Sequence, residues 1–227
     1  MSIAFLPITI DVRLPNEELL LEFCKQYKIR TTAKDGHSSW WDFTPVLMRA
    51  TEEEVYDANK LKDILANRYN AGLGTPRYLN NIDKLFPEIP YMLEQLPYKE
   101  LTLVTIMKQM KPVDYHTDTN DFDIHLDPTE VAYELEPKRY NILLNKHEYQ
   151  DCLFVADQIG GTKIYPRIPK ERPCHVIPDR VHAHGADYCG PDKLMLCVIG
   201  GILDRELHQT MIQDSLTKYS SEAIIFS

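Results

Sequence analysis

Basic residues are fewer than acidic residues in this chain of 227 residues. It carries 25 Lys and Arg against 34 Asp and Glu, and its formal net charge is −9. The chain therefore has no basic footprint for phosphate backbones, and we expect no nucleic acid partner. Long apolar runs are also missing, so the sequence offers no candidate membrane span and we expect no membrane partner. Small-molecule and peptide substrates remain open, and the oligomeric state is undetermined.

The cysteines are scattered along the chain and form no paired motif. The thiols number five, and no two of them form a C-x-x-C pair, which argues against a disulfide framework and a structural zinc site. The first residues, MSIAFLPITID, lack the positive leader of a signal peptide and favour a first strand. These absences predict reduced thiols in a cytoplasmic protein. The cysteines are Cys24, Cys152, Cys174, Cys189 and Cys197.

No internal repeat, low-complexity tract or linker interrupts the chain, so we expect a single domain over 1–227. Residues 1–100 carry helix patterns behind the first strand and are expected to support the core. Asn16 can cap a helix whose apolar face holds Leu19, Phe23 and Tyr27 at spacings of four.

Two more helices are expected before residue 100. Thr51 and Glu54 have the spacing of a capping box, which predicts an amphipathic helix from Thr51 to Tyr69. Prolines bound a third helix in FPEIPYMLEQLP and limit its length.

From Leu101 the pattern changes to short apolar or alternating runs separated by Pro, Gly and Asp. Regular short strands of this kind indicate a sandwich or barrel, so 101–204 is expected to form a β core. Gly160 and Gly161 predict a hairpin turn, and 205–227 is expected to hold a final helix and tail. The predicted fold class is mainly β with flanking helices.

A first candidate metal site lies in YHTDTND, where His116 and Asp118 are two positions apart after the turn-forming KPVD. Period two along an extended chain points both side chains to the same face, where a metal could bind between them. The pair alone is a frequent chance pattern, and taken by itself it is better explained as two polar residues at a strand end.

A second group of residues strengthens the metal hypothesis. His182 and His184 begin a new strand about 65 positions downstream, on the same face, and a lone basic residue, Lys193, follows. Two histidines and one carboxylate on neighbouring strands make the facial triad that holds iron(II) and leaves positions open for a bidentate co-substrate and oxygen. Lys193 would then anchor the far carboxylate of that co-substrate. Its alternative role is to follow the CGPD turn and point to solvent.

This order of H-x-D, distal histidine, basic residue and apolar strand resembles the 2-oxoglutarate- and iron(II)-dependent oxygenases, over roughly Leu101 to Asp204. The resemblance implies a double-stranded β-helix core of the jelly-roll, cupin-like kind. It also implies iron(II) as the metal, 2-oxoglutarate as the co-substrate, and hydroxylation of an unactivated C–H bond in a small molecule or peptide side chain. The branches that the chain resembles are the aspartyl/asparaginyl β-hydroxylases and the prolyl hydroxylases.

The resemblance also implies roles for individual residues. HAHGAD is similar to the family's H-x-x-G-x-N stretch, which implies His182 as the distal ligand and His184 as a pocket-lining residue. KRYNILLN resembles the strand that carries a co-substrate-contacting arginine, which implies this role for Arg139, with Asn141 on the same face. The implied metal ligands are His116, Asp118 and His182.

The sequence departs from the family in two ways. Lys193 stands where most members have Arg, although an ammonium can still bond a carboxylate as a point charge without the bidentate fork. An acidic stretch, 119–138, separates Asp118 from Arg139 and is interpreted as an inserted loop, either a substrate lid or a solvated excursion. Ordinary surface or turn roles are expected for the other histidines, His125, His147, His175 and His208.

Two alternative functions remain open. A cupin-like metal enzyme that uses no oxoacid, such as a dioxygenase or an isomerase, typically needs more histidines, with three or four inward ligands. A non-enzymatic barrel that binds a small acid or a protein would keep the fold without an active metal. The oxygenase is the prediction, because H-x-D with a late basic residue fits it better than it fits the cupin pattern.

Overall fold

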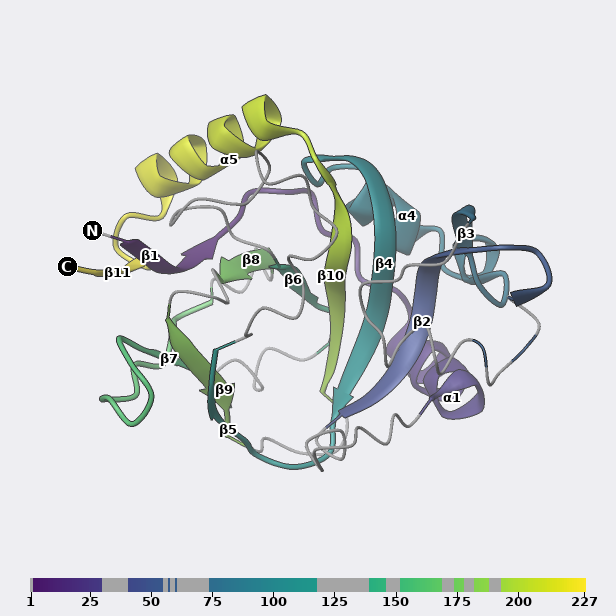
Figure 1. The fold of residues 1–227 in the computed structure, drawn as a ribbon, viewed down its shortest axis with the longest axis horizontal. Coiled ribbons are helices and arrows are strands. Elements are labelled where there is room, and N and C mark those ends of the chain that lie inside the picture. The colour runs from purple at the N-terminus through teal and green to yellow at the C-terminus, as the bar shows by residue number, and fades with distance from the viewer. Residues whose placement is uncertain are drawn as a thin grey trace.

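Two antiparallel sheets organise the protein in the computed structural model (Figure 1). The large sheet has eight strands in the order β11-β1-β8-β6-β10-β4-β2-β3, and the small sheet has three in the order β5-β9-β7. The residues that the structure describes are 2–29, 41–54, 57, 60, 74–117, 139–145, 152–168, 174–177, 182–187 and 193–227. The strands are β1 (Ser2–Pro7), β2 (Trp41–Ala50), β3 (Thr75–Tyr78), β4 (Tyr98–Gln109), β5 (Val113–His116), β6 (Arg139–Leu143), β7 (Leu153–Ala156), β8 (Cys174–Ile177), β9 (Ala183–Ala186), β10 (Leu194–Leu203) and β11 (Ile224–Phe226).

Four described helices flank the sheets, which confirms the prediction of a mainly β fold with helical support. The double-stranded β-helix stays a prediction. No helix in the described ranges is long and apolar enough to cross a membrane. The helices are α1 (Glu17–Tyr27), α3 (Ile82–Leu85), α4 (Glu88–Leu93) and α5 (Arg205–Lys218).

Helix α1 begins where its capping residue predicts. The side chain of Asn16 accepts a hydrogen bond of 3.0 Å from the backbone N–H of Leu19, which satisfies one of the unpaired N–H groups of the first turn. The predicted apolar face is wrong at Leu19, which is 64% exposed. The buried face holds the predicted Phe23 together with Leu20 and Cys24, because spacings of three and four together follow the helical repeat more closely than fours alone.

The capping box at Thr51 forms as predicted. The N–H of Thr51 donates to the carboxylate of Glu54 at 2.7 Å, and the N–H of Glu54 donates to the hydroxyl of Thr51 at 3.3 Å. Most of the helix predicted to follow it lies outside the described residues, as does the acidic stretch 119–138.

The first hundred residues contribute more strand than the sequence pattern predicts. Both β2 and β3 belong to the large sheet, with β2 paired to β4. Two properties of β2 hide it from a search for alternating residues. It is buried along almost its whole length, so it has no polar face, and Pro45 interrupts it beside a shift of register against β4.

The two faces of the large sheet pack against different partners. Ile142 and Leu196 represent one face, and they join the main hydrophobic core with residues of α1 and α4, while α5 packs against its edge. Asn141 and Cys197 represent the opposite face, which lines a cavity together with residues of the small sheet. This division follows from the alternation of side chains along a strand, and it separates the structural core from the candidate site.

The prediction that all cysteines are reduced thiols is wrong at Cys152, which is disulfide-bonded. Cys24 and Cys174 are buried thiols. A disulfide requires two Cα atoms about 4.4–6.8 Å apart with their Cβ atoms directed towards each other, and a fold can achieve this without any C-x-x-C spacing. The cytoplasmic location therefore loses one of its arguments and stays a prediction.

Candidate functional site

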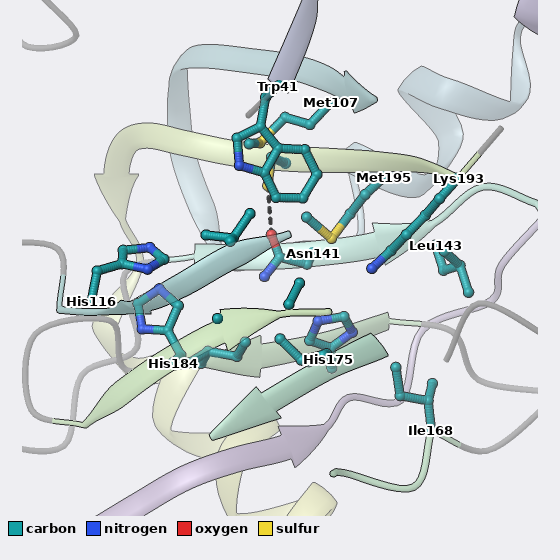
Figure 2. Close-up of a pocket in the computed structure, with 16 residues that line it drawn as sticks. Trp41, Met107, His116, Asn141, Leu143, Ile168, His175, His184, Lys193 and Met195 are labelled. Carbon is teal, nitrogen blue, oxygen red and sulfur yellow. Dashed lines mark hydrogen bonds between the residues drawn. The ribbon is translucent and has the colours of Figure 1, made fainter. Parts of the chain in front are cut away.

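A mainly apolar cavity of ≈ 80 Å³ lies between the two sheets. Its walls come from strands far apart in sequence. Trp41 of β2, Met107 of β4 and Met195 of β10 line the side of the large sheet, while His116 of β5 and His184 of β9 line the side of the small sheet (Figure 2). Because both sheets supply its walls, the cavity exists only in the assembled fold.

Two histidines of the small sheet lie next to each other, with their ring planes tilted by 53°. His116 and His184 occupy opposite positions in the antiparallel pair β5–β9, and their ring centroids are 4.2 Å apart. Nδ1 of His116 donates to the backbone carbonyl of Asp114 at 2.9 Å, and Nδ1 of His184 lies 3.4 Å from the carbonyl of His182. A carbonyl can only accept a hydrogen bond, so Nδ1 is the donor in each contact.

The structure brings His184, and not the predicted His182, to His116. His182 precedes β9, and its ring lies 4.9 Å from that of Phe226 in β11. His184 lines the cavity, whereas His182 is absent from its lining. The two rings therefore have different neighbours, and the regular strand begins only at Ala183.

The third predicted ligand, Asp118, lies directly beyond the last described residue of its segment, Thr117. Within the described residues no three His, Cys, Asp or Glu side chains are grouped so as to hold a metal. His116 and His184 fit two positions of a facial triad, each with Nδ1 turned to a backbone carbonyl in the manner of metal-ligating histidines. Asp118 stays the predicted third ligand.

Lys193 is the unusual residue of the cavity. It is 5% exposed, and burial lowers the pKa of its ammonium to about 8 from an ordinary 10.5. In the described part of the chain it forms no ion pair or hydrogen bond. Figure 2 shows its amine reaching into the cavity from one side, with His116 and His184 at the other side and Asn141 between them. The alternative of a solvent-facing turn residue is wrong.

Asn141 lies buried in the cavity wall, as its predicted role requires. Its Oδ1 accepts a hydrogen bond of 2.6 Å from the thiol of Cys197 on the neighbouring strand β10, and Figure 2 shows its amide nitrogen turned towards the cavity. The backbone of Arg139 pairs with that of Ile177 in β8; the predicted contact of the Arg139 side chain with a co-substrate is not tested.

Sequence reasoning missed His175 and misjudged His208. His175 is 2% exposed, sits opposite Asn141 in the β6–β8 pair and lines the cavity. His208 is also buried, and its Nδ1 shares a hydrogen bond of 2.7 Å with the hydroxyl of Tyr140. The alternation in CHVI could have assigned His175 to a face, but no sequence spacing links it to His116. His125 and His147 lie outside the described residues.

Comparison with known proteins adds no family. No protein-family model matches the chain, and no curated protein is significantly similar to it. The functional argument therefore rests on the residues of the cavity.

Proposed function

We propose that the protein is an iron(II)- and 2-oxoglutarate-dependent oxygenase that hydroxylates an unactivated C–H bond of a small molecule or peptide side chain. The observation that carries this proposal is the arrangement of one cavity, with the histidine pair on one side and the buried ammonium of Lys193 on the other. A dicarboxylic oxoacid needs both features, because one end must chelate a metal and the other must find a positive charge.

His116 and His184 would hold iron(II) through Nε2, with Asp118 as the third ligand. The choice of His184 over His182 is the one change from the sequence prediction. The chemistry that iron(II) supplies in such a site is activation of dioxygen, at positions that the three protein ligands leave open. The backbone carbonyls behind each Nδ1 keep both rings oriented before the metal arrives.

Lys193 would pair with the distal carboxylate of 2-oxoglutarate. A carboxylate next to the ammonium favours its charged form and would raise the pKa that burial has lowered. Asn141 would donate its amide N–H to a ligand oxygen between the two ends, held in place by the thiol of Cys197. In a largely apolar cavity these few polar groups decide how the acid is oriented.

The apolar walls would exclude water from the reacting C–H bond. Trp41, Met107 and Met195 form one side of the cavity and cluster with Phe43 and Cys197. Apolar walls favour an apolar substrate group next to the histidine pair, because such a group loses no hydrogen bonds to water when it enters the cavity.

Anaerobic titration tests the proposal. Iron(II) and 2-oxoglutarate together should give the weak visible charge-transfer band of a metal chelate. His116→Ala and His184→Ala should abolish the band, His182→Ala should keep it, and Lys193→Met should weaken binding of 2-oxoglutarate while metal binding persists. Loss of the band in His182→Ala, with retention in His184→Ala, would restore the sequence prediction. Absence of any band, with no conversion of 2-oxoglutarate to succinate in air, would contradict the oxygenase.

The cupin-like alternative gains one observation, since His175 lines the same cavity as the histidine pair. It does not form a three-residue metal group with them in the described part of the chain, so the oxygenase remains the better proposal. Metal binding that depends on His175 and is unaffected by 2-oxoglutarate would favour the cupin-like enzyme.

A further inference from the structure

The amine of Lys193 can act as a nucleophile as well as carry a charge. Its side chain is enclosed by the protein and reaches into a cavity whose described lining contains no carboxylate. The other titratable groups in that lining are the imidazoles of His116, His175 and His184 and the thiol of Cys197. A lysine buried without a counter-ion is the setting in which lysines act as nucleophiles.

We propose that Lys193 is a covalent binding site for small aldehydes, which it captures as a reversible imine. The nitrogen lone pair attacks the carbonyl carbon, a proton moves from nitrogen to oxygen to give a carbinolamine, and loss of one water leaves the C=N bond. No oxidant or reductant takes part, and hydrolysis reverses the reaction. This capacity is independent of the proposed oxygenase function.

The lowered pKa supports the reactivity of this amine. With a pKa of about 8 instead of 10.5, the neutral fraction at pH 7 rises roughly 300-fold. A less basic amine is also a weaker nucleophile, and a Brønsted coefficient of about 0.5, as for thiols, leaves a rate advantage of roughly tenfold. The faster reaction of Lys193 should therefore be measurable against the exposed lysines of the same protein.

The cavity selects the class of aldehyde. Its apolar walls favour an uncharged carbonyl compound with a short alkyl chain. Cys197 could compete as a nucleophile, but a hemithioacetal is not trapped by cyanoborohydride, whereas an imine is reduced to a stable secondary amine.

Reductive trapping provides the experiment. The folded protein is treated with propanal and sodium cyanoborohydride between pH 7 and 10, and each lysine is followed by peptide mapping. Lys193 should be alkylated at least about tenfold faster than the exposed Lys84 and Lys218 at pH 7. Its rate should level off above about pH 8. Unfolding in urea should abolish the preference.

Two results would overturn the inference: alkylation of Lys193 in the folded protein no faster than that of Lys84 and Lys218, or a rate for Lys193 that keeps rising up to pH 10. Lys193→Arg, which should lose the corresponding modified peptide, confirms the assignment. Protection by iron(II) with 2-oxoglutarate is a separate measurement that bears on the proposed function. If Lys193 is alkylated as expected but iron(II) with 2-oxoglutarate does not protect it, the imine proposal stands and the oxygenase proposal is weakened. If Lys193 is not alkylated faster than the exposed lysines, the imine proposal fails and the oxygenase proposal is unaffected.

Discussion

At the scale of single residues, Lys193 is a charged side chain buried in a mainly apolar cavity. An ammonium loses hydration energy when it is buried, and in the described part of the chain no carboxylate compensates for that loss. A group kept at such a cost is more easily explained by a ligand than by stability. The sequence indicated this residue because it precedes a strongly apolar strand, but not that it is buried.

Replacing Lys193 by Met should stabilise the protein without ligand. The pKa is about 8 when folded against 10.5 as reference, so between these values the unfolded state binds more protons and stability rises with pH. Below pH 8 the buried ammonium lowers the free energy of unfolding by its full amount, about 3 kcal/mol for a pKa shift of this size. Urea unfolding should show Lys193→Met more stable by about 2–3 kcal/mol at pH 7, with little difference above pH 10.

Lys84→Met is the matched control, because Lys84 is exposed, and it should change stability by less than about 0.5 kcal/mol. A destabilised Lys193→Met at pH 7 would mean that the ammonium already has a partner in the folded protein.

At the scale of elements, β9 is the strand on which the site depends. It pairs with β5 on one side and with β7 on the other, and it carries His184 opposite His116. Gly185 follows directly, and a Cβ there would lie 2.3 Å from a ring carbon of Phe154 and 2.5 Å from the carbonyl oxygen of Val113. The small sheet therefore closes only with glycine at this position.

Gly185→Ala should destabilise the protein by about 2–3 kcal/mol, since both close atoms belong to packed strands that must move apart. Gly160→Asn is the control. Gly160 has φ +81° with open space around its Cβ position, and Asn tolerates this backbone region, so a change within about 0.5 kcal/mol is expected. Equal stability of the two variants by urea unfolding would show that β5 and β9 are not held as tightly as their pairing indicates.

At the scale of the whole molecule, the cavity joins the two sheets. A ligand that contacts His184 on the small sheet and Lys193 beside the large sheet would bind only when both are folded and packed together. Binding to the folded state alone stabilises it by RT ln(1 + [L]/Kd), about 2.7 kcal/mol at a ligand concentration of 100 Kd.

Anaerobic thermal unfolding should therefore show one transition that moves upward when iron(II) and 2-oxoglutarate are added together. Lys193→Met should keep the shift caused by the metal and lose the increment caused by 2-oxoglutarate. Two separate transitions, of which only one responds to the ligands, would contradict a site shared between the sheets.

Local chemistry made some of the fold predictable. The cap at Asn16, the capping box at Thr51 and the turn at Gly160 each depend on residues within a few positions of one another, and each forms as expected. Strand β2 was missed because burial on both faces and Pro45 remove the alternating pattern. Prediction succeeded where the stabilising contact is local and failed where burial comes from distant strands.

The sequence by itself determined the candidate chemistry: an acidic chain with few basic residues, a β-rich second half, H-x-D, two further histidines and one lysine before an apolar strand. Only the tertiary structure decided which of these meet. His184 faces His116 because the β5–β9 register aligns them, while His182 packs against Phe226 from the far end of the chain. His175 joins the cavity through the β6–β8 register, and Lys193 lies buried in the cavity that residues of both sheets line. Register and sheet packing depend on residues far apart in sequence, and spacing along the chain does not encode them.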